Sequence, residues 1–386
     1  MKINAFTTYA VIFLLSITLY NSDIAYSLLP LSDNTKLLIL ITSAISLLWG
    51  SYFTIIFKKK TINQNIPTSL FFYIEKLFFL SLFLTAIQII LQPNLPIIEA
   101  LKGAESHKYF VSSYGVPLLF PILLNLLMIT AILYSYLLLQ NFSNRKKLIS
   151  RIIFSFLILF VFFSRGTIAL TLISIFFLYL NNMNKSNFRI IYLLIFGLVS
   201  VYLFGLMGNV RVQDSNFILR IAGVNSELFQ KKIPSEFFWT YIYITSPLSN
   251  LEFTVITSSH HQFNFISLFS FDMLPDLISK YFIDLSSWRL YRPIVIDAFT
   301  VGTIYARPIF NSGIFGAYII FFVLLFFLTL IYLIKINSSI LQVYNSLLCT
   351  FSFICIFTNP LVFTGTILPL VILFIFEFFL RRQLNE

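Results

Sequence analysis

The chain has 386 residues, of which 58% are hydrophobic, 18% aromatic and only 11% charged, and its mean hydropathy is +0.89. Soluble domains are about 45–50% apolar and carry about 25% charged residues, so the composition excludes a soluble globular protein and indicates an integral membrane protein. The formal net charge of +11 would favour a nucleic-acid partner only if the basic residues gathered outside the membrane.

Membrane-spanning helices need about 20 largely apolar residues, and the chain offers ten candidates: 5–20, 37–57, 70–91, 116–139, 150–163, 167–180, 190–207, 313–334, 341–358 and 361–380. The first is expected to be an uncleaved anchor, because no clean signal-peptidase site follows it. These runs predict an all-α polytopic membrane protein with about ten transmembrane helices in a single domain over residues 1–386. Seven spans fall in residues 1–207 and three in 313–386. Between them lies a large loop, 208–312.

The orientation follows from the basic residues of the short segments, because Lys and Arg concentrate on the cytoplasmic side. Fourteen lie on the face that holds both termini: Lys2, Lys58, Lys59, Lys60, Lys76, Arg145, Lys146, Lys147, Arg151, Lys185, Arg189, Lys335, Arg381 and Arg382. The short segments of the other face hold four: Lys36, Lys102, Lys108 and Arg165. We therefore predict cytoplasmic termini and an outward-facing long loop. That loop carries eight basic and eight acidic residues, so no nucleic-acid partner is expected.

The stretch "SRGTIAL" (164–170) interrupts two strongly apolar runs. Residues 152–180 could form one long span, but this would place Lys185 and Arg189 outside, against the positive-inside bias. A hairpin of two spans is therefore preferred. We expect Gly166 to allow the tight turn between them.

Arg165 is expected to lie below the outer membrane surface. It follows Arg151 by fourteen residues, or about 21 Å of helix, whereas the hydrocarbon core is about 30 Å thick. A structural interpretation is a snorkelling or ion-paired arginine. The functional interpretation is an anion site, since the arginine fork suits a phosphate better than a lysine does.

Two aromatic segments of the long loop are predicted to be interfacial helices. The first, "PSEFFWTYIYITSPLSN" (234–250), is too short to span the membrane; Ser235 suits its N-cap and Glu236 its first turn. The second is "FISLFSFDMLPDL" (265–277). Both combine apolar faces with aromatic side chains that are typical of a membrane interface.

The remaining candidates for chemistry also lie in the long loop. "SSHHQ" (258–262) holds a possible general base, because histidine titrates near neutrality, although a loop histidine is often incidental. The loop arginines are candidates for anion binding, or else part of a solvated surface balanced by the eight acidic residues. No metal-ligand spacing or nucleotide-binding motif accompanies them. Cys349 and Cys355 lie in an apolar run and are expected to be core residues. No cofactor and no metal are predicted.

Four short stretches stand in the order and spacing of a known family. They are "SRGTIAL" at the hairpin, "GLMGNVR" (205–211) at the end of a span, "YIYITSPLSNL" (241–251) in the long loop and "DAFTVGTIYARPIFNSGIFGAYI" (297–319) entering the next span. On these residues, which we call the polymerase-like stretches, and in its layout of ten or more spans, the chain resembles the bacterial O-antigen polymerases. The resemblance extends over nearly the whole chain.

The resemblance implies a glycosyltransferase of the bacterial inner membrane. Such an enzyme transfers a nascent glycan from undecaprenyl diphosphate to a sugar hydroxyl of an incoming lipid-linked unit, at the periplasmic face, for O antigen or capsule. The implied partners are the lipid-linked oligosaccharide donor and acceptor, membrane lipid, and a chain-length regulator and flippase of the same pathway.

The resemblance also suggests roles for particular residues. Arg165 and Arg211 match polymerase-like stretches and would bind the diphosphate, with Arg220, Arg289 and Arg292 as further candidates. Related ligases use a loop histidine near the acceptor, but His260 and His261 match no polymerase motif. Glu252 and Asp214 are the alternative catalytic residues.

Three other functions compete with the polymerase: a transporter or flippase of lipid-linked sugars, a ligase-like glycosyltransferase, and a non-catalytic assembly partner. Transporters commonly show repeats with broken helices in corresponding halves, and the sequence shows no such pairing. An arginine-lined lateral groove would favour the enzyme, and a pathway through both faces would favour the transporter.

Overall fold

The computed structural model describes residues 3–58, 68–102, 114–142, 144–182, 197–199, 201–202, 204–209, 212, 214, 216–224, 233–258, 263–279, 294–296 and 299–384. Within these ranges every regular element is a helix and no β-strand forms. The all-α prediction is therefore confirmed.

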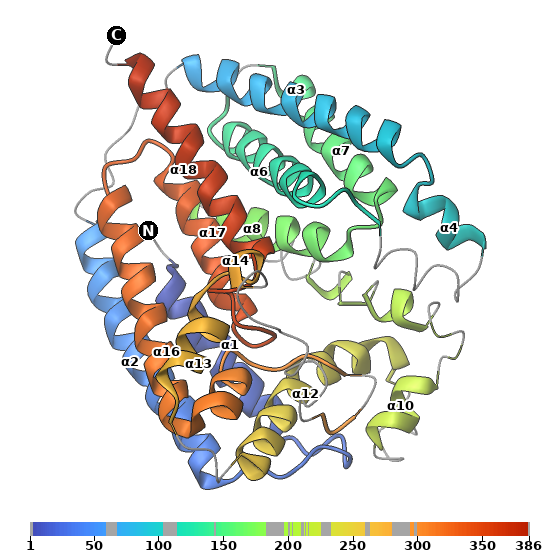
Figure 1. The fold of residues 1–386 in the computed structure, drawn as a ribbon, viewed down its shortest axis with the longest axis vertical. Coiled ribbons are helices and arrows are strands. Elements are labelled where there is room, and N and C mark those ends of the chain that lie inside the picture. The colour runs from blue at the N-terminus through green and yellow to red at the C-terminus, as the bar shows by residue number, and fades with distance from the viewer. Residues whose placement is uncertain are drawn as a thin grey trace.

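Long helices make up most of the molecule (Figure 1). Their bounds are α1 Ala5–Tyr20, α2 Asp33–Lys58, α3 Thr68–Leu91, α6 Leu119–Leu139, α7 Arg145–Val161, α8 Arg165–Asn182, α12 Ser235–Thr257, α16 Ala306–Lys335, α17 Leu341–Ile354 and α18 Thr364–Leu384. Shorter helices are α4 Pro96–Lys102, α10 Phe217–Ala222, α13 Phe265–Leu268, the π-helix η1 Phe269–Met273 and α14 Asp276–Ser279.

Five helices are long and apolar enough to cross a membrane, and they fall in Asp33–Ile56, Ser69–Leu91, Leu119–Leu139, Ala306–Lys335 and Thr364–Arg382. The chain is thus a membrane-embedded protein. Shorter apolar helices occupy Ala5–Tyr20, Gly197–Asn209 and Leu341–Ile354. The complete set of ten spans remains a prediction: the runs 5–20, 150–163, 167–180 and 341–358 fall on shorter or less apolar helices, and most of 190–207 lies outside the described residues.

The segment around "SRGTIAL" is a helical hairpin, so the alternative of one long span is wrong. Helix α7 ends at Val161 and α8 begins at Arg165. The turn depends on Phe163, whose φ is +54°, while the Ser164 N–H donates to Leu159 O at 3.0 Å. These features form a Schellman-type helix end. The expectation for Gly166 is therefore corrected: it lies in the first turn of α8, and the left-handed residue is Phe163.

Helix ends from distant parts of the sequence meet at one end of the bundle. The Ile3 N–H donates to Asn181 Oδ1 at 3.0 Å, and Asn345 Nδ2 donates to Ile3 O at 2.9 Å. Gln140 Nε2 donates to Gln342 Oε1 at 3.1 Å. We call this the basic end, because the basic residues on the helix ends that meet there are Lys76, Arg145, Lys146, Lys147, Arg151, Lys335, Arg381 and Arg382.

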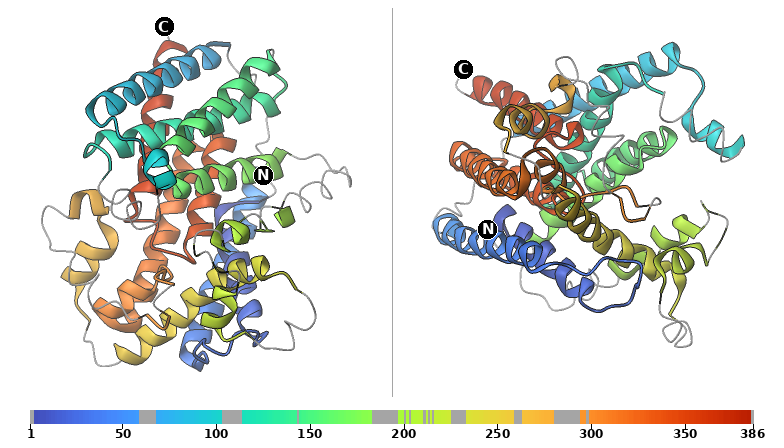
Figure 2. Two further views of the ribbon diagram at one scale, coloured as in Figure 1. Left: turned by 90° about the vertical axis from the view of Figure 1, so that its right-hand side faces the viewer. Right: turned by 60° about the horizontal axis from the view of Figure 1, so that its bottom comes forward.

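At the opposite end of the bundle, the segments that connect the long helices form hydrogen bonds with helix ends. The Leu29 N–H donates to Ser249 Oγ at 2.9 Å, and the Ile304 N–H donates to Cys355 O at 2.7 Å. Helix α12 packs here against α1 and α16 (Figure 2). It continues to Thr257 and is longer than predicted.

The start of α12 differs in one detail from the sequence-based expectation. Pro234 occupies the N-cap position and gives no side-chain hydrogen bond, so Ser235 is not the cap. Glu236 does lie in the first turn, where a carboxylate interacts favourably with the helix dipole.

Candidate functional site

The stretch "GLMGNVR" forms a close contact with α12. A Cβ added to Gly205 would lie 2.0 Å from the Glu236 carbonyl oxygen, and one added to Gly208 would lie 2.6 Å from the Trp239 ring. Asn209 Oδ1 accepts a 2.7 Å hydrogen bond from Trp239 Nε1. Glycine is needed at both positions because its missing side chain lets two helices approach each other.

Asn250 connects α12 to the segment that leads into α16. Its Nδ2 donates to Phe299 O at 2.8 Å and to Val301 O at 2.7 Å, and its Oδ1 accepts from the Val295 N–H at 2.9 Å. Asn250 is almost fully buried. One amide side chain thus satisfies three backbone groups, and it fixes two of the polymerase-like stretches against each other.

A buried ion pair joins η1 to the start of α16. Arg307 Nε donates to Asp272 Oδ1 at 2.8 Å, and Asn311 Nδ2 donates to Asp272 Oδ2 at 3.3 Å. The Asp272 side chain is fully buried. Burial raises the pKa of Asp272 to about 6, although Arg307 and Asn311 favour its charged form.

Sequence reasoning missed this pair. The two residues stand 35 positions apart, and no spacing motif connects them. The available signal was a carboxylate inside the apolar run "FISLFSFDMLPDL", since a buried charge requires a partner. Arg307 also lies within a polymerase-like stretch, but its position there does not distinguish it from the loop's other basic residues.

A pocket of about 360 Å³ opens at the opposite end, between α12 and a kink in α16. The kink lies at Ser312 and at Gly313, whose φ is +67°. The Ser258 Oγ atom is buried and has no hydrogen-bond partner within the described part of the chain. The lining residues are Asn34, Val255, Ser258, Phe263, Ile309, Ser312, Gly313, Ile314 and Phe315.

Glu252 is a buried carboxylate that lies close in the sequence to residues that line this pocket. Its Oε2 accepts a 3.0 Å hydrogen bond from Ser32 Oγ. Val255, one helical turn beyond Glu252, and Asn34, two residues beyond Ser32, both line the pocket. Glu252 itself does not line the pocket, and its catalytic role stays a prediction.

Arg165 begins α8 and is exposed. Its guanidinium carbon lies 4.2 Å from the centre of the Phe163 ring. The first-turn N–H groups of a helix lack intrahelical partners and carry a partial positive charge. The guanidinium and this helix terminus are thus two positive features in one place.

Asp214 and Arg220 bind each other, with a 2.6 Å distance between Oδ2 and Nη2, and both are partly exposed. Arg220 would have to exchange this carboxylate for an anionic ligand. Arg211, His260, His261, Arg289 and Arg292 lie outside the described residues. Ser258 and Phe263, the nearest described residues on either side of the two histidines, both line the pocket.

Within the residues that the structure describes, no group of three or more His, Cys, Asp or Glu side chains could hold a metal ion. Fold and composition define a class, the all-helical membrane proteins. Comparison of the chain with protein families, with curated proteins and with solved structures finds no match.

Proposed function

We propose that this protein is a metal-independent glycosyltransferase of lipid-linked oligosaccharides, which polymerises repeat units for O antigen or a capsule. In the proposed orientation the opposite end of the bundle faces the periplasm and the basic end faces the cytoplasm of a bacterial inner membrane. Its donor and acceptor are glycans on undecaprenyl diphosphate.

The observation that carries the proposal is the meeting of polymerase-like stretches at the opposite end. Gly205 and Gly208 pack on the start of α12. Asn250, near the other end of α12, binds the backbone at Phe299 and Val301. Asn250 therefore holds the stretches 241–251 and 297–319 together, and the glycines of 205–211 pack on the part of α12 just before residue 241, with a pocket and a buried carboxylate nearby.

The transfer would proceed by attack of the acceptor hydroxyl on the anomeric carbon of the donor. The new glycosidic bond forms as the bond from that carbon to the diphosphate oxygen breaks, and the diphosphate leaves with the electron pair. The hydroxyl proton passes to a base, for which Glu252 and the loop histidines are the candidates. A cation near the diphosphate stabilises the charge that develops there.

The test is an assay of glycan length with Arg165 variants in a reconstituted system that contains a defined lipid-linked repeat unit. Arg165→Ala is expected to abolish the polymer while membrane abundance stays normal. Arg165→Lys should restore it only in part, since lysine keeps the charge and loses the bidentate fork. Arg145→Ala is the matched control, because Arg145 is also exposed and begins α7 at the basic end.

Two results would contradict this role. If Arg165→Ala lowers abundance while the remaining protein keeps its specific activity, Arg165 is structural. If both abundance and glycan ladder stay normal, Arg165 has neither role. In the same assay, activity of Glu252→Gln and of a double His260→Ala, His261→Ala variant separates the candidate bases.

The proposed orientation can be tested by labelling single cysteines in intact cells. The native cysteines, Cys349 and Cys355, are buried, so an introduced residue gives the signal. His261→Cys should react with an impermeant maleimide from outside, and Lys146→Cys only after lysis. The reverse pattern would refute the orientation and move the proposed chemistry to the other face.

A further inference from the structure

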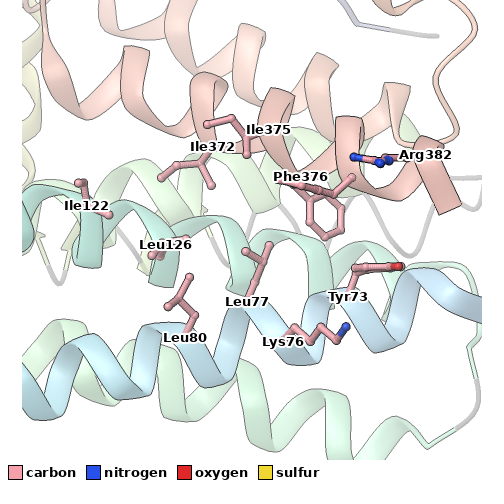
Figure 3. A pocket seen from close by; sticks show the side chains of 11 residues that line it. Tyr73, Lys76, Leu77, Leu80, Ile122, Leu126, Ile372, Ile375, Phe376 and Arg382 are labelled. Atoms are coloured by element: carbon pink, nitrogen blue, oxygen red, sulfur yellow. The ribbon is translucent and has the colours of Figure 1, made fainter.

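A second cavity lies at the side of the bundle, away from the polymerase-like stretches. It has a volume of about 740 Å³ and is bounded by α3, α6 and α18 (Figure 3). Its walls are apolar except at one end, where Tyr73, Lys76 and Arg382 stand together. We propose that this groove binds one anionic phospholipid, with an acyl chain along the apolar walls and the phosphate at Lys76 and Arg382.

The apolar walls are exposed to the surroundings of the protein. Leu80, Ile375 and Phe379 are 45%, 53% and 54% exposed. They come from two helices that face each other across the groove, and buried Leu126 of α6 forms part of its floor. A volume of this size falls in the range of small-molecule sites, about 300–1,000 Å³.

The dimensions fit one leaflet of a bilayer. From Ile372 to Arg382 the groove follows ten residues of α18, which is about 15 Å of helix. The hydrocarbon core is about 30 Å thick, so this length is about half of it. A chain in the groove would therefore reach the bilayer middle while its head group stays at the polar end.

The charges at the polar end favour an anion. The two carboxylates nearby are already bound by other cations: Glu75 by Lys147 at 3.0 Å and Arg151 at 3.3 Å, and Glu377 by Lys335 and Arg381, both at 2.6 Å.

Among the described side chains, the four cations of these two ion-pair clusters together with Lys76 and Arg382 make six basic groups against the two carboxylates, a difference of +4. The Lys76 ammonium lies over the rings of Phe72, at 4.3 Å, and Tyr73, at 5.3 Å. These contacts hold the cation beside the groove, and no carboxylate of the described residues forms an ion pair with it.

Tyr73 adds a hydrogen-bonding group that suits a phosphate. Its Oη atom is buried and has no partner within the described part of the chain, and Figure 3 shows it at the same end of the groove as Arg382, on the facing wall. A buried hydroxyl without a partner is unfavourable. A phosphate oxygen of a bound lipid would accept its proton.

The test uses the full-length protein purified in detergent and native mass spectrometry. Phosphatidylglycerol and phosphatidylcholine with identical acyl chains are offered in equal amounts. The expected result is retention of one phosphatidylglycerol per chain in preference to phosphatidylcholine. Each of Lys76→Gln and Arg382→Gln should lower that preference about fivefold, the effect expected for one cation near anionic lipid.

The matched control is Lys146→Gln. Lys146 is exposed at the same end, but the apolar residues beside it belong to one helix, α7, and form no groove between helices. The preference of the Lys146→Gln variant for phosphatidylglycerol should stay within twofold of that of the wild type. Leu80→Trp fills the groove without changing charge, and it should remove the retained lipid of either class.

Three results would overturn the proposal. The first is equal retention of the two lipids. The second is an equal effect of the Lys76, Arg382 and Lys146 variants, which would indicate a diffuse surface potential. The third is a dimer in the wild type that Leu80→Trp dissociates, which would make a second copy of the chain the occupant. Failure of the glycan assay leaves the lipid measurement unaffected, so the two proposals are tested separately.

Discussion

The two ends of the bundle pair their buried charges in opposite ways. At the basic end, Glu377 lies between Lys335 and Arg381, each 2.6 Å away. At the opposite end, Arg307 lies between Asp272 at 2.8 Å and Asp276 at 3.5 Å. The first cluster has a net charge of +1 and the second of −1, so the sign of the net charge is reversed between the two clusters.

This reversal has a consequence for the proposed substrate. A lipid diphosphate at the opposite end would meet carboxylates as well as arginines, and both Arg220 and Arg307 already face carboxylates. Arg165 lies elsewhere, at the start of α8. Selectivity for the diphosphate would therefore rest on where the cations stand and not on a general excess of positive charge.

The largest effect is expected from removing the buried carboxylate of the negative cluster, which consists of Asp272, Asp276 and Arg307. Asp272→Ala leaves Arg307 buried with only the more exposed Asp276, and breaking a buried pair costs about 3–5 kcal/mol. Asp214→Ala removes a partly exposed pair and should cost about 0–1 kcal/mol. Denaturation of the purified variants in mixed micelles measures both.

Similar losses for the two variants would show that Asp272 is not buried in the membrane-embedded protein. A large loss for Asp214→Ala alone would reverse the comparison. Glu377→Ala at the basic end offers an independent reference, because Lys335 would be left buried beside it.

The second effect concerns the packing of the polymerase-like stretch "GLMGNVR". Gly205→Ala would place a methyl group 2.0 Å from the Glu236 carbonyl oxygen, and overpacking costs about 1–3 kcal/mol. Gly197→Ala is the control in the same apolar stretch, since its Cβ meets nothing within 4 Å. The measurement is the free energy of unfolding together with glycan length.

If the alanine at 205 is tolerated as well as the one at 197, the close contact with α12 does not form. A loss of glycan length in both variants with unchanged stability would place the effect elsewhere. Only a selective loss in Gly205→Ala supports the packing of this stretch on α12.

The long apolar helices could be predicted from the sequence because a membrane span leaves a continuous signal of about 20 residues. The hairpin at Arg165 was also predictable, since the alternative would have moved several basic residues across the membrane. The length of α12 was not, because Pro247 and its polar neighbours interrupt the apolar pattern. Tertiary packing against α1 and α16 extends the helix regardless.

The candidate site was harder to predict than the fold. The pairing of Asp272 with Arg307 depends on how η1 lies against α16, which no local pattern encodes. The error at Gly166 has a similar cause: a glycine suggests a turn, but the left-handed position fell on Phe163. The conformational preference of a single residue predicts the turn position poorly where the ends of two helices fix the backbone between them.

The effect that is smallest per step of the measurement is a dependence of stability on pH through Asp272. Burial raises its pKa from 3.8 to about 6 in the folded state. Between these values the folded protein binds a proton that the unfolded chain has released, so this group stabilises the fold at low pH. That contribution is lost as the pH rises through about 6, with a slope of at most about 1.4 kcal/mol per pH unit.

The measurement compares the wild type with Asp272→Asn, which keeps an oxygen for Arg307 but does not titrate. Unfolding midpoints are recorded from pH 4 to 7, so that all other titrating groups contribute equally to both proteins. The wild type should lose stability relative to the variant up to about pH 6 and run parallel to it above. Parallel curves over the whole range would mean that Arg307 outweighs burial and keeps Asp272 ionised, and the negative cluster would then be charged at every pH at which the protein folds.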